Sequence, residues 1–436
     1  YQDTFVKACL AAGINAEVID PEEAKRMEPS VNPSLIGAVK VPDGSVDPFR
    51  LCASNVFDAK IHGAKVLVYS EVIEFIKEQD TIKGVKVLDH HTGIVTDYYA
   101  PVTVNAGGIW GHHIAQMAGA NISMFPAKGA LLIFAHRVNS VVINRCRKPA
   151  NADILVPGDT VCVIGTTSTR VPYEECDHLK VTPDEVDLLL TEGAKLAPCL
   201  AETRVLRAYA GVRPLVSADN DPSGRNISRG IVCLDHETRD GIKGFISITG
   251  GKLMTYRLMG EMAADAVCKK LGRDAKCVTA DTPLPGSEPG GIEEISKKIW
   301  EVPTMVQKAS VGRFGTQAAN LDFDGDVKGS LVCECEEVSV SEVDSAIENL
   351  EVNNLVDLRR RTRFGMGTCQ GELCACRAAG RLAKARKCTA KARADLKDFM
   401  DERWKGMYPV AWGETLRESA YTQWVYSEVM GLGEEI

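Results

Sequence analysis

The chain has 436 residues, of which 45% are hydrophobic and 25% charged, a composition typical of globular proteins rather than disordered ones. Its 59 acidic residues outnumber the 51 basic ones and give a net charge of −8, which disfavours nucleic-acid binding because phosphate neutralisation requires a basic surface. No apolar run reaches the ~18 residues of a spanning helix and no signal peptide opens the chain, so we expect neither a transmembrane nor a secreted protein.

Residues 37–140 alternate between strand-like and helix-like segments, which predicts a mixed α/β fold. Asp20 and Asp47 each precede a proline, the pattern of an N-cap followed by the first turn of a helix. Helices are therefore expected at the start of the chain, after Asp20, from Asp47 towards His62, and over 114–119. Strands are expected at 16–19, 38–41, 65–69, 82–88 and 100–105.

Residues 121–250 are richer in strands and contain one helical pattern, over 183–196. The strands are expected at 131–134, 141–144, 160–164, 204–210 and 244–249. A long helix is expected over 252–271, and a Pro/Gly-rich stretch at 282–291 then indicates a linker. We divide the chain into a first domain (1–281), a linker with helices (282–327), a cysteine-rich unit (328–388) and an aromatic-rich tail (389–436).

Cysteines are numerous, at 15, but most are scattered singly, which indicates reduced thiols and not a disulfide framework. Two close pairs are the exception, namely Cys333 with Cys335 and Cys369 with Cys374. Two pairs of thiolates can enclose either a zinc ion or a [2Fe–2S] cluster. Three glycines around Cys369 favour the cluster, because their amides can approach inorganic sulfide, and Cys376 is interpreted as a bystander.

The segment between the two cysteine pairs is predicted to form two short helices, over 340–350 and 355–361. With Val-Cys-Glu-Cys before them and Gly-Met-Gly-Thr-Cys-Gln-Gly-Glu-Leu-Cys after them, it resembles the bacterioferritin-associated-ferredoxin-like (BFD-like) [2Fe–2S] domains. Four arginines lie beside this unit, at 359–361 and 363. They fit a solvated helix face, charge compensation for an anionic cluster, or docking of an acidic partner.

Two glycine-rich turns follow predicted strands and suit the close approach of a dinucleotide. The first runs from Asn105 to Trp110, and the second is Gly250-Gly-Lys252, whose following helix would direct amides and a positive dipole end at a reduced flavin. A third segment, Gly211-Val-Arg-Pro-Leu215, places an arginine between a glycine turn and a proline. The G-x-G-x-x-G motif of a dinucleotide-binding βαβ unit is missing from the sequence.

Together with Asp47-Pro-Phe-Arg50, Lys128-Gly129 and Gly165-Thr-Thr167, these segments resemble the FAD-dependent glycerol-3-phosphate dehydrogenases. The cysteine-rich unit and the tail narrow the resemblance to the large catalytic subunits of the anaerobic enzymes. It implies a DAO-type FAD-dependent oxidoreductase fold (α/β, with α+β character) joined to a small helical BFD-like [2Fe–2S] domain. Members of the family bind the ADP half of FAD with an N-terminal βαβ unit, so we expect the present sequence to be truncated there and its FAD binding to be impaired.

The resemblance further implies oxidation of sn-glycerol 3-phosphate to dihydroxyacetone phosphate by hydride transfer to FAD. Electrons would then pass through the [2Fe–2S] centre and partner subunits to a membrane quinone. Catalytic roles are implied for Arg213, Arg229 and Lys252, since guanidinium forks hold phosphate and a cation stabilises a developing alkoxide. The catalytic base stays unassigned, because Leu131 occupies the position at which aerobic relatives carry a histidine.

Cofactor contacts are also carried over from the family, position by position. Cluster ligation is implied for Cys333, Cys335, Cys369 and Cys374. Flavin contacts are implied for Val72, Asn105, Ala106, Gly107, Gly108, Trp110, Gly211, Gly250, Gly251, Leu253, Met254 and Thr255.

Two other functions stay open at this point. One is a related flavin oxidoreductase that acts on an amine or a 2-hydroxy acid, and the other is a non-catalytic electron-transfer protein with a structural four-cysteine metal site. Six aromatic residues between Trp404 and Tyr426 fit either packing against the chain's own body or a docking surface for partner subunits, where aromatics are enriched. Membrane-anchoring partners would place the chain at the cytoplasmic side of the inner membrane as a peripheral protein.

Overall fold

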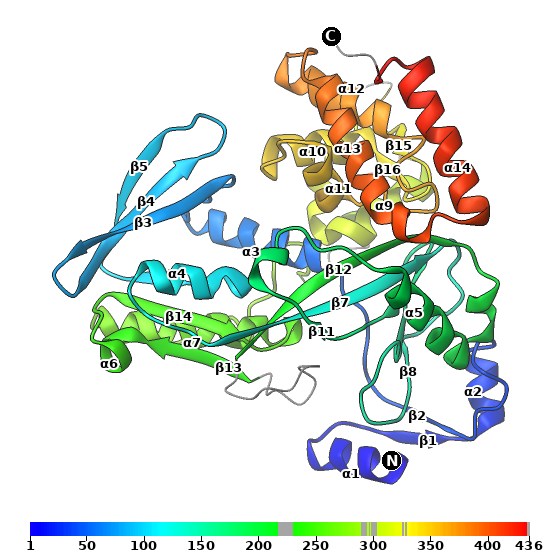
Figure 1. The fold of residues 1–436 in the computed structure, drawn as a ribbon, viewed down its shortest axis with the longest axis horizontal. Helices are drawn as coiled ribbons and strands as arrows, with labels where there is room; N and C mark the ends of the chain where they lie inside the picture. The colour runs from blue at the N-terminus through cyan, green and yellow to red at the C-terminus, as the bar shows by residue number, and fades with distance from the viewer. Residues whose placement is uncertain are drawn as a thin grey trace.

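The computed structural model describes residues 1–216, 230–288, 294–295, 297, 303–324, 327 and 329–433 (Figure 1). Within these ranges, no helix combines the length and the apolar character that crossing a membrane requires.

The largest sheet is built around β7 (Met124–Phe134), a long strand that is paired along both edges. One edge pairs antiparallel with β12 (Val205–Val216), from Met124 opposite Val216 to Phe134 opposite Val205. The other edge is shared by β11 (Thr169–Arg170) and β10 (Cys162–Gly165), beyond which lie β9 (Ile154–Pro157) and β8 (Ile143–Asn144). Because side chains alternate along a strand, this sheet has two faces with different neighbours.

One face of the sheet forms a core with α5 (Pro183–Leu196). The helix begins in a capping box, in which the Thr182 hydroxyl accepts from the Glu185 amide at 3.3 Å and the Glu185 carboxylate accepts from the Thr182 amide at 3.0 Å. The core includes Ala130, Leu132, Phe134, Val186 and Leu189, all buried. The intervening residues of β7, such as Leu131, therefore point to the opposite face.

A second, three-stranded sheet has the order β13 (Ile231–Asp235), β14 (Phe245–Gly250), β6 (Thr103–Asn105). β14 runs parallel to β6 with Ser247 opposite Asn105, so the segments that follow these two strands leave the sheet at the same edge. Helices around it are α4 (Gly111–Met117), α6 (His236–Asp240) and α7 (Tyr256–Lys270), with single 3-10 turns at Gly108–Trp110 and Leu253–Thr255.

The N-terminal segment confirms both predicted caps. Asp20 accepts from two amides at the start of α2, and Asp47 does the same at the start of α3. The elements are α1 (Gln2–Ala11), β1 (Glu17–Ile19), α2 (Pro21–Met27), β2 (Ala38–Lys40), α3 (Pro48–Ile61), and the antiparallel β3 (Ser70–Glu78), β4 (Thr81–Asp89) and β5 (Val95–Tyr99).

Four sequence-based expectations were wrong in detail. The strand expected at 65–69 is not formed, because Val66 and Val68 line a small cavity against α3 and the strand begins only after Tyr69, whose φ is +53°. Residues 211–215 are not a turn: they continue β12, since the whole segment pairs with β7. The strand expected at 131–134 is the end of the longer β7. The helix expected from Lys252 begins as a 3-10 turn and becomes α-helical at Tyr256.

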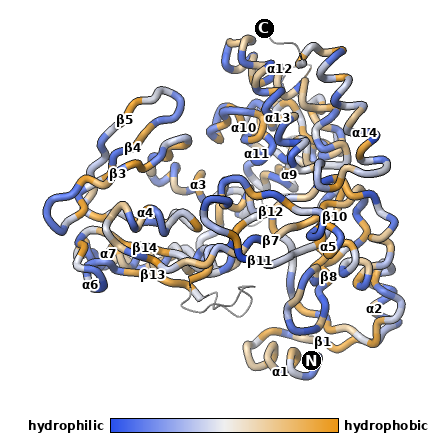
Figure 2. Tube along the Cα trace, viewed as in Figure 1, coloured by the Kyte–Doolittle hydropathy of each residue, from blue (hydrophilic) through white to orange (hydrophobic). Residues whose placement is uncertain are grey.

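The cysteine-rich unit has a core of its own. Its elements are β15 (Leu331–Cys333), β16 (Val338–Ser339), α10 (Val340–Asn349), α11 (Leu355–Thr362) and α12 (Ala375–Arg386), and both predicted helices between the cysteine pairs are confirmed. Leu355, Leu358, Phe364 and Leu382 are completely buried in this core. In Figure 2, hydrophobic and hydrophilic residues intersperse along these helices, as amphipathic packing requires.

The tail packs on both halves of the protein. It consists of α13 (Ala392–Met407), a 3-10 turn (Tyr408–Val410), α14 (Gly413–Trp424) and a π-helical turn (Val425–Val429). The region before the cysteine-rich unit contains α9 (Thr304–Phe314) and a 3-10 segment (Gly315–Asn320). Phe399 and Tyr426 belong to the core of the cysteine-rich unit, whereas Val410 belongs to the core beneath β7. The tail therefore joins the two cores, and Figure 1 shows its helices (orange to red) above the end of β12.

Candidate functional site

The first glycine-rich turn is held by the buried side chain of Asn105 at the end of β6. Its Oδ1 accepts from the Gly107 amide at 3.1 Å, and its Nδ2 donates to the Gly111 carbonyl at 2.8 Å and to Ser247 Oγ at 3.1 Å. Asn105 thus fixes the turn and ties it to β14, while Ala106, Gly107 and Gly108 keep accessible backbone. Trp110, half-exposed, donates from Nε1 to Asp177 at 2.8 Å.

The second turn follows β14 at the same edge of the sheet. Gly250 and Gly251 have φ of +76° and +68°, the region that side chains disfavour. A Cβ on Gly251 would also lie 2.7 Å from Met259 Sδ. The Lys252 amide donates to Thr255 Oγ1 at 3.0 Å, and the side chains of Leu253 and Met254 are exposed beside it. Two glycine backbones at one sheet edge fit the flavin half of FAD, which requires close approach without side chains.

Arg213 lies on β12, opposite Ala127 of β7. Its Nη2 donates to the Thr166 hydroxyl, and its guanidinium covers Gly129, where a Cβ would lie 2.6 Å from Nη2. This close approach explains the Lys128-Gly129 step of the sequence. Gly211, two residues before Arg213 on the strand, pairs with Gly129 and leaves open space above the sheet.

Three other residues of the predicted flavin and substrate site are Val72, Lys252 and Arg229. Val72 is half-buried on β3, where it pairs with Val87 of β4. Lys252 is exposed. Arg229 lies outside the described residues.

The four predicted cluster ligands meet at the start of α12. The Cys374 thiol forms hydrogen bonds with both Cys333 and Cys369, and Cys369 also contacts Cys335. The thiol of Cys374 and the amides of Leu373 and Gly371 lower the pKa of Cys369 to about 5. Hydrogen bonds with Cys333 and Cys369, together with burial, raise the pKa of Cys374. Among the described residues, no three His, Cys, Asp or Glu side chains are placed so that they could hold one metal ion.

Thiols in mutual contact fit the donor set of a [2Fe–2S] cluster, which takes two thiolates on each iron. Cys376 stands apart from them, since its Sγ donates to Met430 Sδ at 3.7 Å. Two glycines allow the loop to pack closely around the thiols. A Cβ on Gly367 would collide with Cys335, and Gly371 has a φ of +95°, which side chains disfavour.

A cavity of about 1200 Å³ separates the β7–β12 sheet from the cysteine-rich unit. Leu131 and Tyr209 line it on the sheet side, and Arg359 and Cys335 line it on the other side. No local sequence pattern indicates this space, because its walls come from segments far apart in the chain. It joins the face of the sheet that carries Arg213 to one of the four cysteines.

Ion pairs close the junction of the two units around this cavity. Arg363 donates to Asp47 at 2.9 Å and to Glu336 at 2.9 Å, so the carboxylate that caps α3 also binds the cysteine-rich unit. These opposing charges raise the pKa of Arg363, although burial opposes them. Of the four arginines of the sequence cluster, Arg359 is buried and Arg363 is ion-paired, so the solvated-face interpretation was wrong for both.

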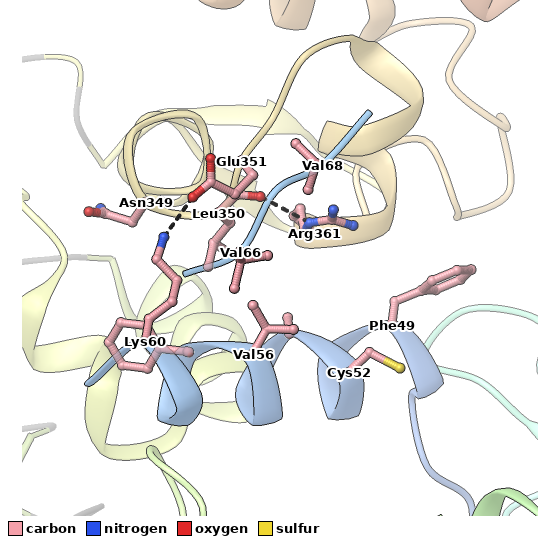
Figure 3. Close-up of a pocket in the computed structure, with 12 residues that line it drawn as sticks. Phe49, Cys52, Val56, Lys60, Val66, Val68, Asn349, Leu350, Glu351 and Arg361 are labelled. Carbon is pink, nitrogen blue, oxygen red and sulfur yellow. Dashed lines mark hydrogen bonds and ion pairs between the residues drawn. The ribbon is translucent and has the colours of Figure 1, made fainter. Parts of the chain in front are cut away.

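A smaller cavity of about 150 Å³ lies between α3 and the loop after α10. Figure 3 shows Val56 and Lys60 of α3 facing Leu350 and Glu351, with Lys60 bound to Glu351 at 2.7 Å. This apolar contact with its rim ion pair is a second fixed point between the two units.

Comparisons with known proteins agree with this geometry. The model of the family of FAD dependent oxidoreductases matches residues 2–257, and that of the BFD-like [2Fe-2S] binding domains matches 331–382. The chain is 58% identical over 435 residues to a subunit of the anaerobic glycerol-3-phosphate dehydrogenase of Haemophilus influenzae, covering 100% of this chain and 77% of that one. The corresponding subunit of Escherichia coli strain K12 is 59% identical over 436 residues, covering 100% and 80%.

The fold has a counterpart among solved structures. The X-ray structure of the glycerol-3-phosphate dehydrogenase of Bacillus halodurans complexed with FAD aligns with a TM-score of 0.71 at 21% identity, covering 92% of this chain and 84% of that one. These matches confirm the predicted fold class, an FAD-dependent oxidoreductase domain with a BFD-like [2Fe–2S] domain.

Gly371→Ala tests the loop between Cys369 and Cys374. The residue has a φ of +95°, and a Cβ would lie 2.6 Å from two ring carbons of buried Phe399. We expect a loss of at least about 1–3 kcal/mol in the free energy of unfolding from the backbone strain alone, measured by denaturant unfolding. Gly380→Ala, in α12 with open space around its Cβ, is the control and should be neutral or stabilising. Equal effects of the two changes would contradict this account of the loop.

Proposed function

Because the chain belongs to a family of anaerobic glycerol-3-phosphate dehydrogenase subunits, we propose that it oxidises sn-glycerol 3-phosphate to dihydroxyacetone phosphate. In this reaction the carbinol carbon loses a hydride and its hydroxyl group loses a proton. When bound, FAD supplies the hydride acceptor and the [2Fe–2S] cluster supplies a one-electron carrier. The position of Arg213, on the face of the sheet that leads to the large cavity, is the observation that carries the proposal.

Arg213 is the residue that we propose holds the substrate phosphate. A guanidinium binds phosphate through two parallel hydrogen bonds, and the contact with Thr166 together with the missing side chain at Gly129 fixes its direction. A cation held in this way also stabilises negative charge that develops on the substrate oxygen. We propose supporting roles for Lys252, at the second glycine turn, and for Arg229.

The two glycine-rich turns are proposed to hold the flavin. Their backbone lies at the shared edge of β6 and β14, and the side chains of the second turn extend the same surface. The proposed flavin contacts are those of the two turns, Asn105, Ala106, Gly107, Gly108, Trp110, Gly250, Gly251, Leu253, Met254 and Thr255, together with Val72 on β3 and Gly211 on β12. Of these, we assign Asn105 to fixing the turn, because its three hydrogen bonds are made within the protein.

Substitution of Arg213 tests the phosphate site. With the FAD-loaded full chain and an artificial electron acceptor, Arg213→Gln should lower kcat/KM for sn-glycerol 3-phosphate by about 10- to 100-fold, the value of one or two hydrogen bonds to a charged group. Arg213→Lys should recover part of this loss, and Arg417→Gln, at an exposed ion pair, should leave the rate unchanged.

The substrate class is tested in the same assay. Faster turnover of an amine or a 2-hydroxy acid by the unmodified chain would favour those substrates over a phosphate ester. FAD-loaded protein that oxidises none of them would favour a non-catalytic role in electron transfer.

We propose that the cluster is bound by Cys333, Cys335, Cys369 and Cys374. Cys369→Ser should lower iron and acid-labile sulfide per chain by more than half and remove the visible bands of the cluster. Cys376→Ser is the matched control, because Cys376 lies two residues after the proposed ligand Cys374 but contacts Met430, and it should keep full iron and sulfide. A colourless protein that contains zinc would contradict the cluster.

The tail is proposed to dock partner subunits, which pass electrons from the cluster to a membrane quinone. Of its seven aromatics, Phe399 and Tyr426 are buried, while Trp404, Tyr408, Trp412, Tyr421 and Trp424 are 42–69% exposed. Large exposed aromatics on neighbouring helices are typical of interface anchors. Such partners would hold the chain at the cytoplasmic side of the inner membrane as a peripheral protein.

The double change Trp412→Ala and Trp424→Ala tests this surface. In cells that make the partner subunits, it should lower the share of the chain that sediments with membranes by several-fold, since hot-spot aromatics each contribute about 2 kcal/mol or more. Tyr99→Ala, on β5 and 70% exposed, is the control and should not change that share. An unchanged share in the double variant would contradict docking through the tail.

A further inference from the structure

Two buried arginines meet at one amide beside the cluster loop. Arg207, on β12, donates from Nη1 to Gln370 Oε1 at 3.5 Å, and Arg359, on α11, donates from Nη2 to the same oxygen at 3.0 Å. Their exposures are 7% and 8%, and Gln370 is 1% exposed. The oxygen of a neutral amide is therefore shared by two cations that come from different halves of the protein.

Gln370 directly follows Cys369 in the chain and is itself held rigidly. Its Nε2 donates to the carbonyls of Met366 and Gly367 at 2.9 and 2.8 Å, so the amide oxygen can only face the arginines. Gly406 of α13 closes the site from above, because a Cβ there would lie 2.5 Å from Arg207 Nη2. The cluster loop is thus connected to β12 through one side chain.

The positive charge at this point exceeds what the nearby protein groups neutralise. Nε of Arg359 is buried and makes no hydrogen bond within the described part of the chain. Glu402, at the rim of the large cavity, attracts both guanidiniums through space. Burial lowers the pKa of both arginines, and Arg207 repels Arg359; yet arginine stays protonated in proteins, so the charge must be balanced.

An anionic cluster would balance that charge. Four thiolates and two sulfides outweigh the charge of two irons, and reduction adds one more negative charge. Buried positive charges act through a low effective dielectric, so they stabilise the reduced cluster, which is more negative, more strongly than the oxidised cluster. Net charge and hydrogen bonding around a cluster are the levers by which a protein sets its reduction potential.

We propose that Arg207 and Arg359, acting through Gln370, are positioning residues that hold the cluster loop against β12 and raise the reduction potential of the cluster. This inference rests on the proposed ligation by Cys369 and Cys374. It gives the flavin-side sheet a direct influence on the electron acceptor, because Arg207 belongs to the same face of β12 as Arg213.

The test is a redox titration of the full chain, purified anaerobically and followed by electron paramagnetic resonance, with iron and sulfide measured on the same samples. Arg359→Gln and Arg207→Gln should each shift the one-electron equilibrium about tenfold towards the oxidised cluster, which is about 59 mV. Arg359→Lys and Arg207→Lys, which keep the charge, should shift it less than their glutamine counterparts. Arg377→Gln is the control: this arginine lies near the same thiols but is 44% exposed and paired with Glu334 at 2.5 Å, so the shift should be less than twofold.

The outcomes separate this inference from the proposed cluster itself. Unmodified protein without iron and sulfide would overturn the ligation, whereas clusters with unchanged potentials in both glutamine variants would overturn only the role of the arginines. Should Arg359→Gln fail to retain iron, Arg207→Gln decides, because Arg207 lies on another element, 163 residues from Gln370. A wild-type potential in that variant would then contradict the proposal.

Discussion

The antiparallel pairing of β7 with β12 is the constraint on which the rest of the structure depends. It fixes, in alternation, which residues join the core beneath the sheet and which line the space above it. The upper face of β12 carries Arg207, Tyr209, Gly211 and Arg213. Because a strand rises about 3.3 Å per residue, Arg207 and Arg213, which are six residues apart on β12, lie roughly 20 Å from each other. One strand thus spans from the proposed phosphate site to the cluster loop.

The cysteine-rich unit must also keep a fixed position relative to β12. Arg363 holds the cysteine-rich unit in place because it binds both Asp47 and Glu336. Glu336 also accepts a hydrogen bond from the Thr160 hydroxyl at 3.1 Å. A buried ion pair of this kind adds little net stability over apolar packing, but removal of one partner is costly because the other charge is left without compensation. Its value here is therefore specificity of placement, which the proposed electron transfer between flavin and cluster would need.

Local patterns predicted much of the fold and of the cluster site. Asp47 before Pro48 signalled a helix start, and the cysteine spacing with its glycines signalled the cluster loop; both depend on residues close in the chain. The failures share a physical cause. Gly211 and Pro214 suggested a turn because their local propensity opposes a strand, yet pairing with β7 prevailed. Val66 and Val68 suggested a strand by composition, but they are used to cover α3.

Long-range contacts also decide what the arginines do. The three arginines at 359, 360 and 363 have different surroundings in the folded chain: Arg359 is buried, Arg360 is exposed and Arg363 is ion-paired. Their sequence gives no sign of this, because Arg207, which shares the Gln370 oxygen with Arg359, lies on β12, and the partners of Arg363 lie at the start of α3 and after β15. The tail adds the same kind of constraint, since Val410 and Tyr426 anchor it in separate cores. The oxidoreductase domain and the cysteine-rich domain are thus held in one position relative to each other, while Trp404, Tyr408, Trp412, Tyr421 and Trp424 of the tail stay exposed.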